Sequence, residues 1–170
     1  MGRSYPFPAG EDMELATYLT KLEKNLFFGS ARWVADFTES FRDYTLDGVT
    51  FDMLVTGRMR GKGFLLSRLV SYLLMPNYFA ACLVHAGDVD ATQARRLLRI
   101  AQEYREREEL RFVWLVLVQQ GPFTRKVRAL LDSLREADTL AVALVDLEAE
   151  EVIVNDAYLG HRMQRHVKVF

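Results

Sequence analysis

Two side chains of this sequence have chemical types that suit metal binding or proton transfer: Asp52 and His85. Asp52 interrupts the apolar run Thr50–Leu54, and His85 ends the apolar run that begins at Phe79. A carboxylate within a hydrophobic strand either points to solvent from an edge strand or has a function. Carboxylate oxygen and imidazole nitrogen are both metal ligands, so Asp52 and His85 form a candidate metal pair.

The turn Gly87–Asp90 is the second place where chemistry is expected. It lies between an apolar segment and a predicted helix, and such a turn can hold an anion at the helix N-terminus. The alternative is that Asp88 or Asp90 caps the helix, since Asp90 and Gln93 have the spacing of a capping box. Asp88 is also a third candidate catalytic side chain, beside the carboxylate and the imidazole named above.

A third group of side chains is basic and suits phosphate. Its members occur in two stretches of the sequence, Arg125, Lys126 and Arg128, and then Arg162, Arg165 and Lys168. Together they could form a patch that neutralises the phosphates of DNA or RNA. The alternative is a solvated helix face and a solvated tail. His161 and His166 are five residues apart, which is a poor spacing for two metal ligands on one helix face.

Composition limits the classes of protein that this sequence could encode. A length of 170 residues predicts one domain, over residues 11–170, and half of the residues are hydrophobic, which is ample for its core. Pro6, Pro8 and Gly10 predict a looser arm over residues 1–10. The net charge of −1 provides no general attraction to nucleic acid or to an anionic membrane. The single Cys82, with no apolar leader and no bilayer-length apolar run, predicts a cytoplasmic protein without a membrane partner. No phosphate-binding loop occurs, so no nucleotide cofactor is expected.

The elements that would position these side chains follow from apolar periodicity. Helical spacing predicts a first helix over residues 11–28. A stripe of Val34, Phe37 and Phe41 after the N-cap Ser30 predicts a second helix, which would form a pair with the first.

The later part of the chain has the pattern of strands that alternate with helices. The apolar runs 79–85, 112–118 and 140–147 predict strands, and amphipathic helices are predicted from Ala91 and around Val127. Continuously apolar strands separated by such helices are typical of a parallel sheet that is covered on both faces.

Four shorter segments complete the expected fold. Residues 49–59 favour a strand, residues 64–75 suit either a helix or a buried strand pair, and 152–154 favour an antiparallel return strand. The tail 156–170 favours a short helix and a last strand. The predicted architecture is therefore α/β: a mixed, mainly parallel central sheet with helices on both faces, an N-terminal helical pair and a C-terminal β-hairpin.

This layout, from about Thr45 to Glu151, resembles the restriction-endonuclease-like PD-(D/E)XK group, in which a strand with an early Asp precedes a strand ending in Glu-x-Lys. The resemblance would make Asp52 the first metal-binding carboxylate and Phe79–Gly87 the Glu-x-Lys strand. His85 then stands in place of the Glu, and Gly87 in place of the Lys. Metal-assisted phosphodiester cleavage needs carboxylate-type oxygens around a hard cation, so the resemblance implies a catalytically inactive copy.

Three functions follow as the main alternatives, and a small-molecule enzyme with its site at the strand ends is a fourth. The first is an inactive nuclease-like domain used for binding or assembly, whose binding of nucleic acid would be weak and salt-sensitive. The second is an active nuclease that uses Asp52, His85 and Asp88 as displaced ligands, with Mg²⁺ as its cofactor. The third is a protein-interaction or homodimerisation module.

The third alternative rests on aromatic and methionine side chains that would form an apolar patch if they were exposed. They are Phe27, Phe28, Trp33 and Met75. Exposed apolar patches of this kind mark interaction sites, whereas the same side chains in the interior would simply build the core.

Overall fold

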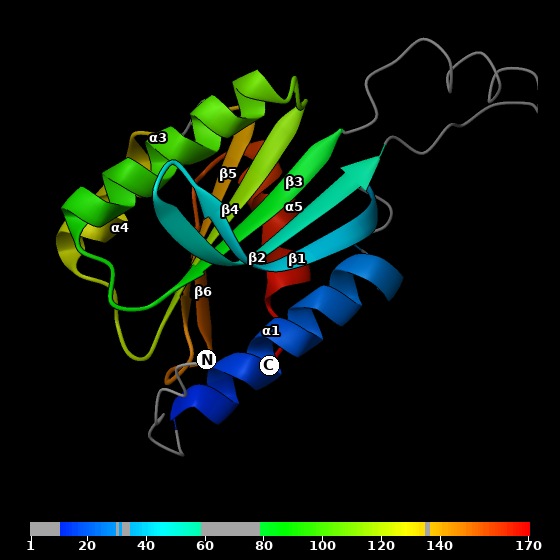
Figure 1. Cartoon of the computed structure of the whole chain (residues 1–170). Helices are drawn as coiled ribbons and strands as arrows, with labels where there is room; N and C mark the ends of the chain where they lie inside the picture. The colour runs from blue at the N-terminus through cyan, green and yellow to red at the C-terminus, as the bar shows by residue number, and fades with distance from the viewer. Residues whose placement is uncertain (1–10, 30, 32–34, 59–78, 135–136) are drawn as a thin grey trace, which may run out of the picture.

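Figure 1 shows the computed structural model of the chain, a six-stranded sheet with helices packed against it. The structure describes residues 11–29, 31, 35–58, 79–134 and 137–170. In chain order its elements are α1 (Glu11–Phe28), β1 (Asp36–Leu46), β2 (Val49–Arg58), β3 (Ala80–Ala86), α3 (Ala91–Arg107), β4 (Phe112–Gln119), α4 (Arg125–Asp132), β5 (Leu140–Asp146), β6 (Glu151–Val154) and α5 (Tyr158–Val167). The strands lie in the sheet in the order in which they occur in the chain.

The three apolar strands predicted to lie side by side in the same direction do so. β3 pairs in parallel with β4, and β4 pairs in parallel with β5, with Trp114 opposite Cys82 on one side and Ala141 on the other. All residues of β5 are buried, and all of β4 except its last residue, Gln119. This confirms the prediction from their continuous apolar character, because only a strand covered on both faces is apolar at every position.

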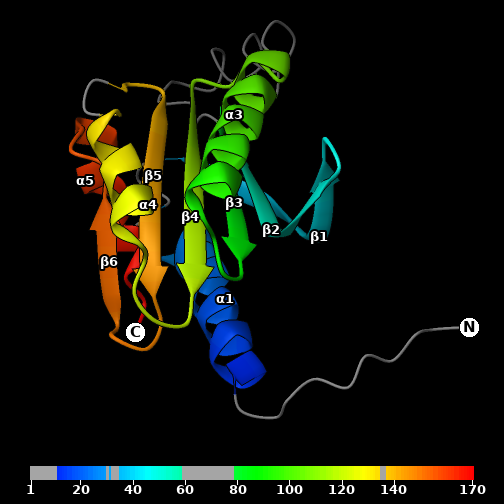
Figure 2. The ribbon, with the colours of Figure 1, turned by 90° about the vertical axis from the view of Figure 1, so that its left-hand side faces the viewer.

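Helices cover both faces of the sheet, as Figure 2 shows with α3 and α4 in front and α1 and α5 behind. Successive residues of a strand point to opposite faces, so each strand contributes to two cores. Cys82 and Trp114 pack in the core that includes α1 and α5. Leu83 and Leu115 pack in the core that includes α3 and α4.

The predicted second helix is wrong where the structure describes it, because residues 36–46 form strand β1. The apolar spacing of Phe37 and Phe41 also fits a strand, since residues four apart share a strand face. A register shift between Phe37 and Glu39 then separates their environments: Phe37 is buried, whereas Phe41 is 42% exposed. Asp47 and Gly48 have φ values of 48° and 72° and form the tight turn from β1 to β2. An Asp-Gly pair of this kind is the usual signal of a two-residue hairpin.

Two further parts of the predicted architecture need correction. The sheet is mixed, but three of its five pairings are antiparallel, namely β1–β2, β2–β3 and β5–β6, so it is not mainly parallel. The hairpin of β5 and β6 is followed by α5, the short helix expected in the tail, but residues 168–170 after it form no strand, so the last strand expected there is wrong. The predictions for residues 1–10 and 64–75, and for Ser30, Trp33 and Val34, concern positions outside the described residues.

Candidate functional site

The structure brings Asp52 and His85 together where β2 lies beside β3. They lie next to the antiparallel pair Met53 and Val84, at the end of the sheet where β3 terminates. The Oδ2 atom of Asp52 accepts a hydrogen bond from the backbone N–H of Ala86 at 2.7 Å. A carboxylate that accepts a backbone N–H makes a short, charge-assisted bond, so Asp52 holds the end of β3 against β2.

Asp52 reaches from β2 to the backbone of β3, and His85 reaches from β3 to the backbone of β2. Its Nδ1 lies 3.1 Å from the carbonyl oxygen of Thr50 on β2. Because a carbonyl can only accept, the Nδ1 atom donates in this contact. The ring of Phe51 lies edge-on to the imidazole at 6.0 Å between centroids. Nε2 is therefore the atom of His85 that could act as a ligand or a base.

The turn after β3 is organised by Asp90. Its carboxylate accepts from the backbone N–H groups of Thr92 and Gln93 at 2.7 and 2.8 Å, and the Gln93 side chain accepts from Asp90 N–H at 3.1 Å. The capping box predicted from the sequence is thus confirmed, and a carboxylate already serves the first turn of α3. Asp88 is exposed on the same turn, beside Gly87 with a φ of 129°.

The ends of β4 and β5 are joined to their neighbours in the same way. The Oε1 atom of Gln119 accepts from Val89 N–H at 3.4 Å, which links β4 to the turn after β3. The Oδ1 atom of Asp146 accepts from the N–H groups of Gly121, Glu148 and Ala149 at 3.1, 3.0 and 3.1 Å. Asp146 is only 4% exposed, so its carboxylate serves the fold and not the solvent.

We call these strand ends and their polar side chains, Asp52, His85, Gln119 and Asp146, the carboxyl rim. Each neighbouring pair of strands from β2 to β5 is linked across the rim by a side chain that binds backbone. In the part of the chain that the structure describes, no three His, Cys, Asp or Glu side chains cluster closely enough to hold a metal ion. Asp52 and His85 are therefore neighbours in a network that connects strand ends.

The two basic groups predicted to share a patch lie on opposite faces of the sheet. Arg125, Lys126 and Arg128 belong to α4, which packs with α3. Arg162, Arg165 and Lys168 belong to α5 and its C-cap, on the face with α1.

Some of these basic side chains already have partners on their own face. Arg128 forms an ion pair with Glu151 at 3.7 Å. The guanidinium of Arg162 lies over the ring of Tyr158 and donates to its hydroxyl at 2.7 Å. The structure therefore does not bring the two groups together as one surface, and each would meet a phosphate backbone separately.

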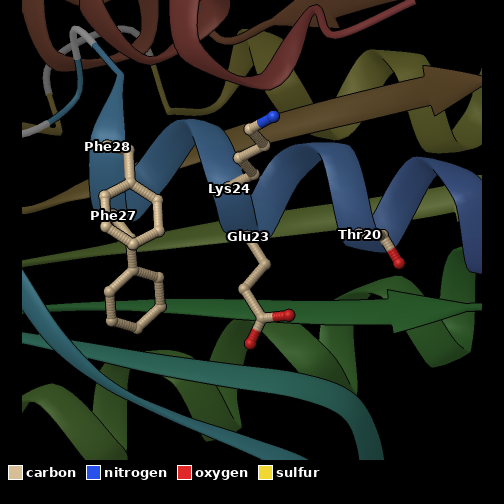
Figure 3. A pocket seen from close by; sticks show the side chains of 5 residues that line it. All are labelled: Thr20, Glu23, Lys24, Phe27 and Phe28. Atoms are coloured by element: carbon tan, nitrogen blue, oxygen red, sulfur yellow. The ribbon is translucent and has the colours of Figure 1, made fainter.

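A hollow lies on the outer side of α1, and Figure 3 shows the side chains that line it: Thr20, Glu23, Lys24, Phe27 and Phe28. Its volume is about 330 Å³. Phe28 is 76% exposed, the highest value among the large hydrophobic side chains whose exposure the structure describes. Its ring lies 6.2 Å from that of Phe27. Of the four side chains expected to form an apolar patch, these two are described, and they border this hollow.

Glu23 fixes one side of the hollow. Its carboxylate accepts from the Arg42 guanidinium of β1 at 2.6 Å. Partial burial alone would raise the pKa of Glu23, but the nearby Ser40 hydroxyl and the hydrogen bond and charge of Arg42 bring the pKa below its usual range. Glu23 is therefore a carboxylate at neutral pH, next to Lys24 on the same helix.

Phe41 is a second exposed aromatic, but it is not part of this hollow. It lies opposite Leu54 in the β1–β2 ladder, and Leu54 packs in the core of the α3 face.

Among the helices that the structure describes, none is both long and apolar enough to cross a membrane. No protein-family model, no curated protein and no solved structure matches this chain.

Proposed function

We propose that this protein is a binding or assembly domain, built on a nuclease-like scaffold whose metal centre no longer works. The observation that carries the proposal is the state of Asp52 and His85. Each is hydrogen-bonded to the backbone of the other's strand, Asp52 to Ala86 and His85 to Thr50. Side chains used in this way stabilise the fold whether or not a metal or substrate is present.

The order of the elements supports the nuclease-like part of the proposal. A helix precedes three antiparallel strands, and β3 then leads through α3 to the parallel strand β4. Asp52 on the second strand and His85 on the third lie at one edge, where the resemblance puts the catalytic acids of the PD-(D/E)XK group. Fold analogy alone establishes no activity, so the residues at this edge decide the question.

The chemistry at the edge argues against metal-dependent cleavage. A hard cation such as Mg²⁺ prefers several oxygen ligands, whereas His85 offers nitrogen. Gly87, at the position of the Lys in the motif, has no side chain and a φ of 129°, a conformation that L side chains rarely adopt. A lysine at this position would be strained, so the backbone itself departs from the motif.

Two variants of Asp52 test the proposal in a cleavage assay with single-stranded and duplex DNA and RNA in Mg²⁺ or Mn²⁺. We expect no cleavage by the unmodified protein, and a lower unfolding midpoint for Asp52→Ala than for Asp52→Asn, because the amide keeps an acceptor oxygen for Ala86 N–H. Metal-dependent cleavage that both substitutions abolish would overturn the proposal.

The same assay decides the second candidate, an active nuclease with the displaced ligands Asp52, His85 and Asp88. Its specific support is the adjacency of Asp52 and His85 and the Nε2 atom of His85, which is not the atom that contacts Thr50. For this candidate, His85→Ala and Asp88→Ala would each reduce cleavage, and Mg²⁺ would be required. Asp90→Asn, which keeps an acceptor oxygen at the cap of α3, is the matched control.

A further inference from the structure

The exposed side of α5 combines an aromatic ring with basic side chains. Tyr158 in the first turn is 71% exposed, and the exposed residues Arg162, Arg165 and Lys168 follow it at steps of three or four positions. Residues at this spacing lie on one side of a helix, and the opposite side of α5, which includes Met163, packs in the core. We call Tyr158, Arg162, Arg165 and Lys168 the α5 basic stripe.

Tyr158 and Arg162 form a preassembled pair at the start of the stripe. The guanidinium carbon of Arg162 lies 5.4 Å from the centroid of the Tyr158 ring, and the guanidinium donates to the Tyr158 hydroxyl at 2.7 Å. These two contacts hold the ring in place although most of the residue is exposed. An ordered aromatic ring beside a guanidinium is a surface on which a nucleobase can stack.

The positive charges of the stripe are not balanced within the chain. Helix α5 contains no acidic residue, and in the part of the chain that the structure describes no carboxylate forms an ion pair with Arg162, Arg165 or Lys168. Helix α3 differs, because its basic side chains pair with carboxylates, as Arg99 does with Glu103. The α5 basic stripe therefore presents net positive charge to solvent, which suits an anionic partner.

A structural role explains only part of the stripe. The helix dipole favours positive charge near the C-terminus of a helix, and this accounts for Arg165 in the last turn. It does not account for an exposed ring in the first turn or for the guanidinium that lies over this ring. The acidic side chain just before the helix, Asp156, already pairs with His161 at 2.9 Å.

We propose that the α5 basic stripe binds about four nucleotides of single-stranded DNA or RNA, with one base stacked on Tyr158 and phosphates on the basic side chains. This inference rests on the binding function proposed above and names its partner. At about 1.5 Å per residue the stripe spans about 15 Å from Tyr158 to Lys168. Stacked nucleotides advance about 3.4 Å each along one strand, so about four match this length.

The packing of α5 favours a single strand over a duplex. An α-helix reads a duplex by entering the major groove, but α5 lies against β5 and β6 with its inner side in the core, as Figure 2 shows. Only one side of the helix is then accessible to a ligand. Stacking on Tyr158 also requires a base that is not paired, which a single strand provides.

The same stripe does not suit an anionic membrane. A helix that lies in a membrane surface inserts a broad apolar side among the lipids. The aliphatic and methionine side chains of α5, Leu159, Met163 and Val167, are instead buried in the protein. Phosphate attraction combined with base stacking is therefore the chemistry that the stripe offers.

Fluorescence anisotropy of a labelled oligothymidine of about twelve nucleotides, in about 50 mM salt, tests the proposal. The corresponding duplex and vesicles of phosphatidylserine and phosphatidylcholine are separate arms. We expect the unmodified protein to bind the single strand more tightly than either. Three phosphate contacts on a single strand predict an affinity that falls about 100-fold for a tenfold rise in salt.

Variants of Tyr158 test the stacking part of the proposal. Tyr158→Ser should weaken binding of the oligothymidine at least about fivefold, because stacking of a base on an aromatic side chain contributes at least about that factor. Tyr158→Phe keeps the ring and should lose much less affinity than Tyr158→Ser. Unfolding midpoints of both variants show whether they are folded.

Reversal of two charges tests the electrostatic part. Arg165→Glu combined with Lys168→Glu should weaken binding at least about tenfold and make it less sensitive to salt. The matched control is Arg95→Glu combined with Arg99→Glu, which changes the net charge equally at two exposed positions of α3, on the opposite face of the sheet. The control should change the affinity by less than about twofold, because salt screens charges at that distance.

The inference is contradicted if the unmodified protein shows no salt-dependent binding of the oligothymidine, or if Tyr158→Ser and the double reversal on α5 bind it normally. Tighter binding of the duplex or of the vesicles would replace the single strand as the partner and would equally contradict it. Cleavage of the oligonucleotide in Mg²⁺ would overturn the proposed function and leave this inference intact. Absence of binding removes the partner and has no bearing on the state of Asp52 and His85.

Discussion

The carboxyl rim and the outer side of α1 carry opposite kinds of side chain. At the rim, the side chains of Asp52, Gln119 and Asp146 bind backbone N–H groups of neighbouring strand ends or turns. On the outer side of α1, the half-buried Phe27 and the exposed Phe28 border a hollow. The difference distinguishes two roles of residues that stand out in the sequence. A polar side chain that hydrogen-bonds to backbone groups stabilises the fold, whereas an exposed ring outside the core is available to a partner.

The largest effect expected at the rim comes from Asp146→Ala. It removes the acceptor for three backbone N–H groups, and the one on Gly121 is buried. We expect the free energy of unfolding to fall by about 2–4 kcal/mol, since a buried donor left without a partner costs about 1–3 kcal/mol. Denaturant titration measures this loss. Glu148→Ala, on an exposed side chain of the same turn, should change it by less than about 0.5 kcal/mol.

Asp52→Ala should have a smaller effect of the same kind. Asp52 accepts one N–H, that of Ala86, and both residues are half-buried. The expected loss is about 1–2 kcal/mol in the same titration. A loss near zero would mean that Asp52 is not a structural side chain, and it would bring back the functional interpretation of a carboxylate in an apolar strand.

A third prediction concerns the inner side of α1, where it meets α5. His166 is buried and stacks on Trp114 with ring centroids 5.8 Å apart, and its carbonyl accepts from Asn25 of α1 at 2.6 Å. Burial, with the charges of Arg162 and Arg165, lowers the pKa of His166. The folded protein therefore favours the neutral imidazole, and its contribution to stability is full above the unfolded pKa of about 6.5 and is lost as pH falls below it.

The measurement is the unfolding free energy between pH 8 and pH 5, for the unmodified protein and for His166→Asn. The unmodified protein should lose stability as pH falls, and the variant should show a shallower slope because asparagine does not titrate. His161→Asn is the control, since His161 is exposed and pairs with Asp156 at 2.9 Å. A slope unchanged by His166→Asn would exclude His166 as its cause.

The sequence predicts the parts of this fold that depend on local patterns. The bounds of α1 match the predicted helix, because its buried stripe of Tyr18, Leu22 and Leu26 has helical spacing and Gly29 follows it. The parallel strands are predictable because short, continuously apolar runs that alternate with amphipathic helices are typical of strands buried on both faces. The capping box of Asp90 is also a local signal.

The parts that the sequence did not predict depend on distant partners or on one irregular residue. The β1 segment has the apolar spacing of a helix, because the register shift after Phe37 hides the strand alternation. The role of Asp146 is not visible in the sequence, because one of its partners, Gly121, lies 25 residues away. Asp52 and His85 were identified as a pair, but their use as links between strands depends on the ladder that joins β2 to β3.

The smallest effect on stability is expected on the outer side of α1, and it is the one that separates the two regions most clearly. Phe28→Ser removes a ring that is 76% exposed, so the unfolding free energy should change by less than about 0.5 kcal/mol. Asp146→Ala should lower the same free energy by about 2–4 kcal/mol, because it leaves a buried backbone donor without a partner. A loss of more than about 1 kcal/mol in Phe28→Ser would show that the ring supports the fold, and the contrast between the two regions would then be lost.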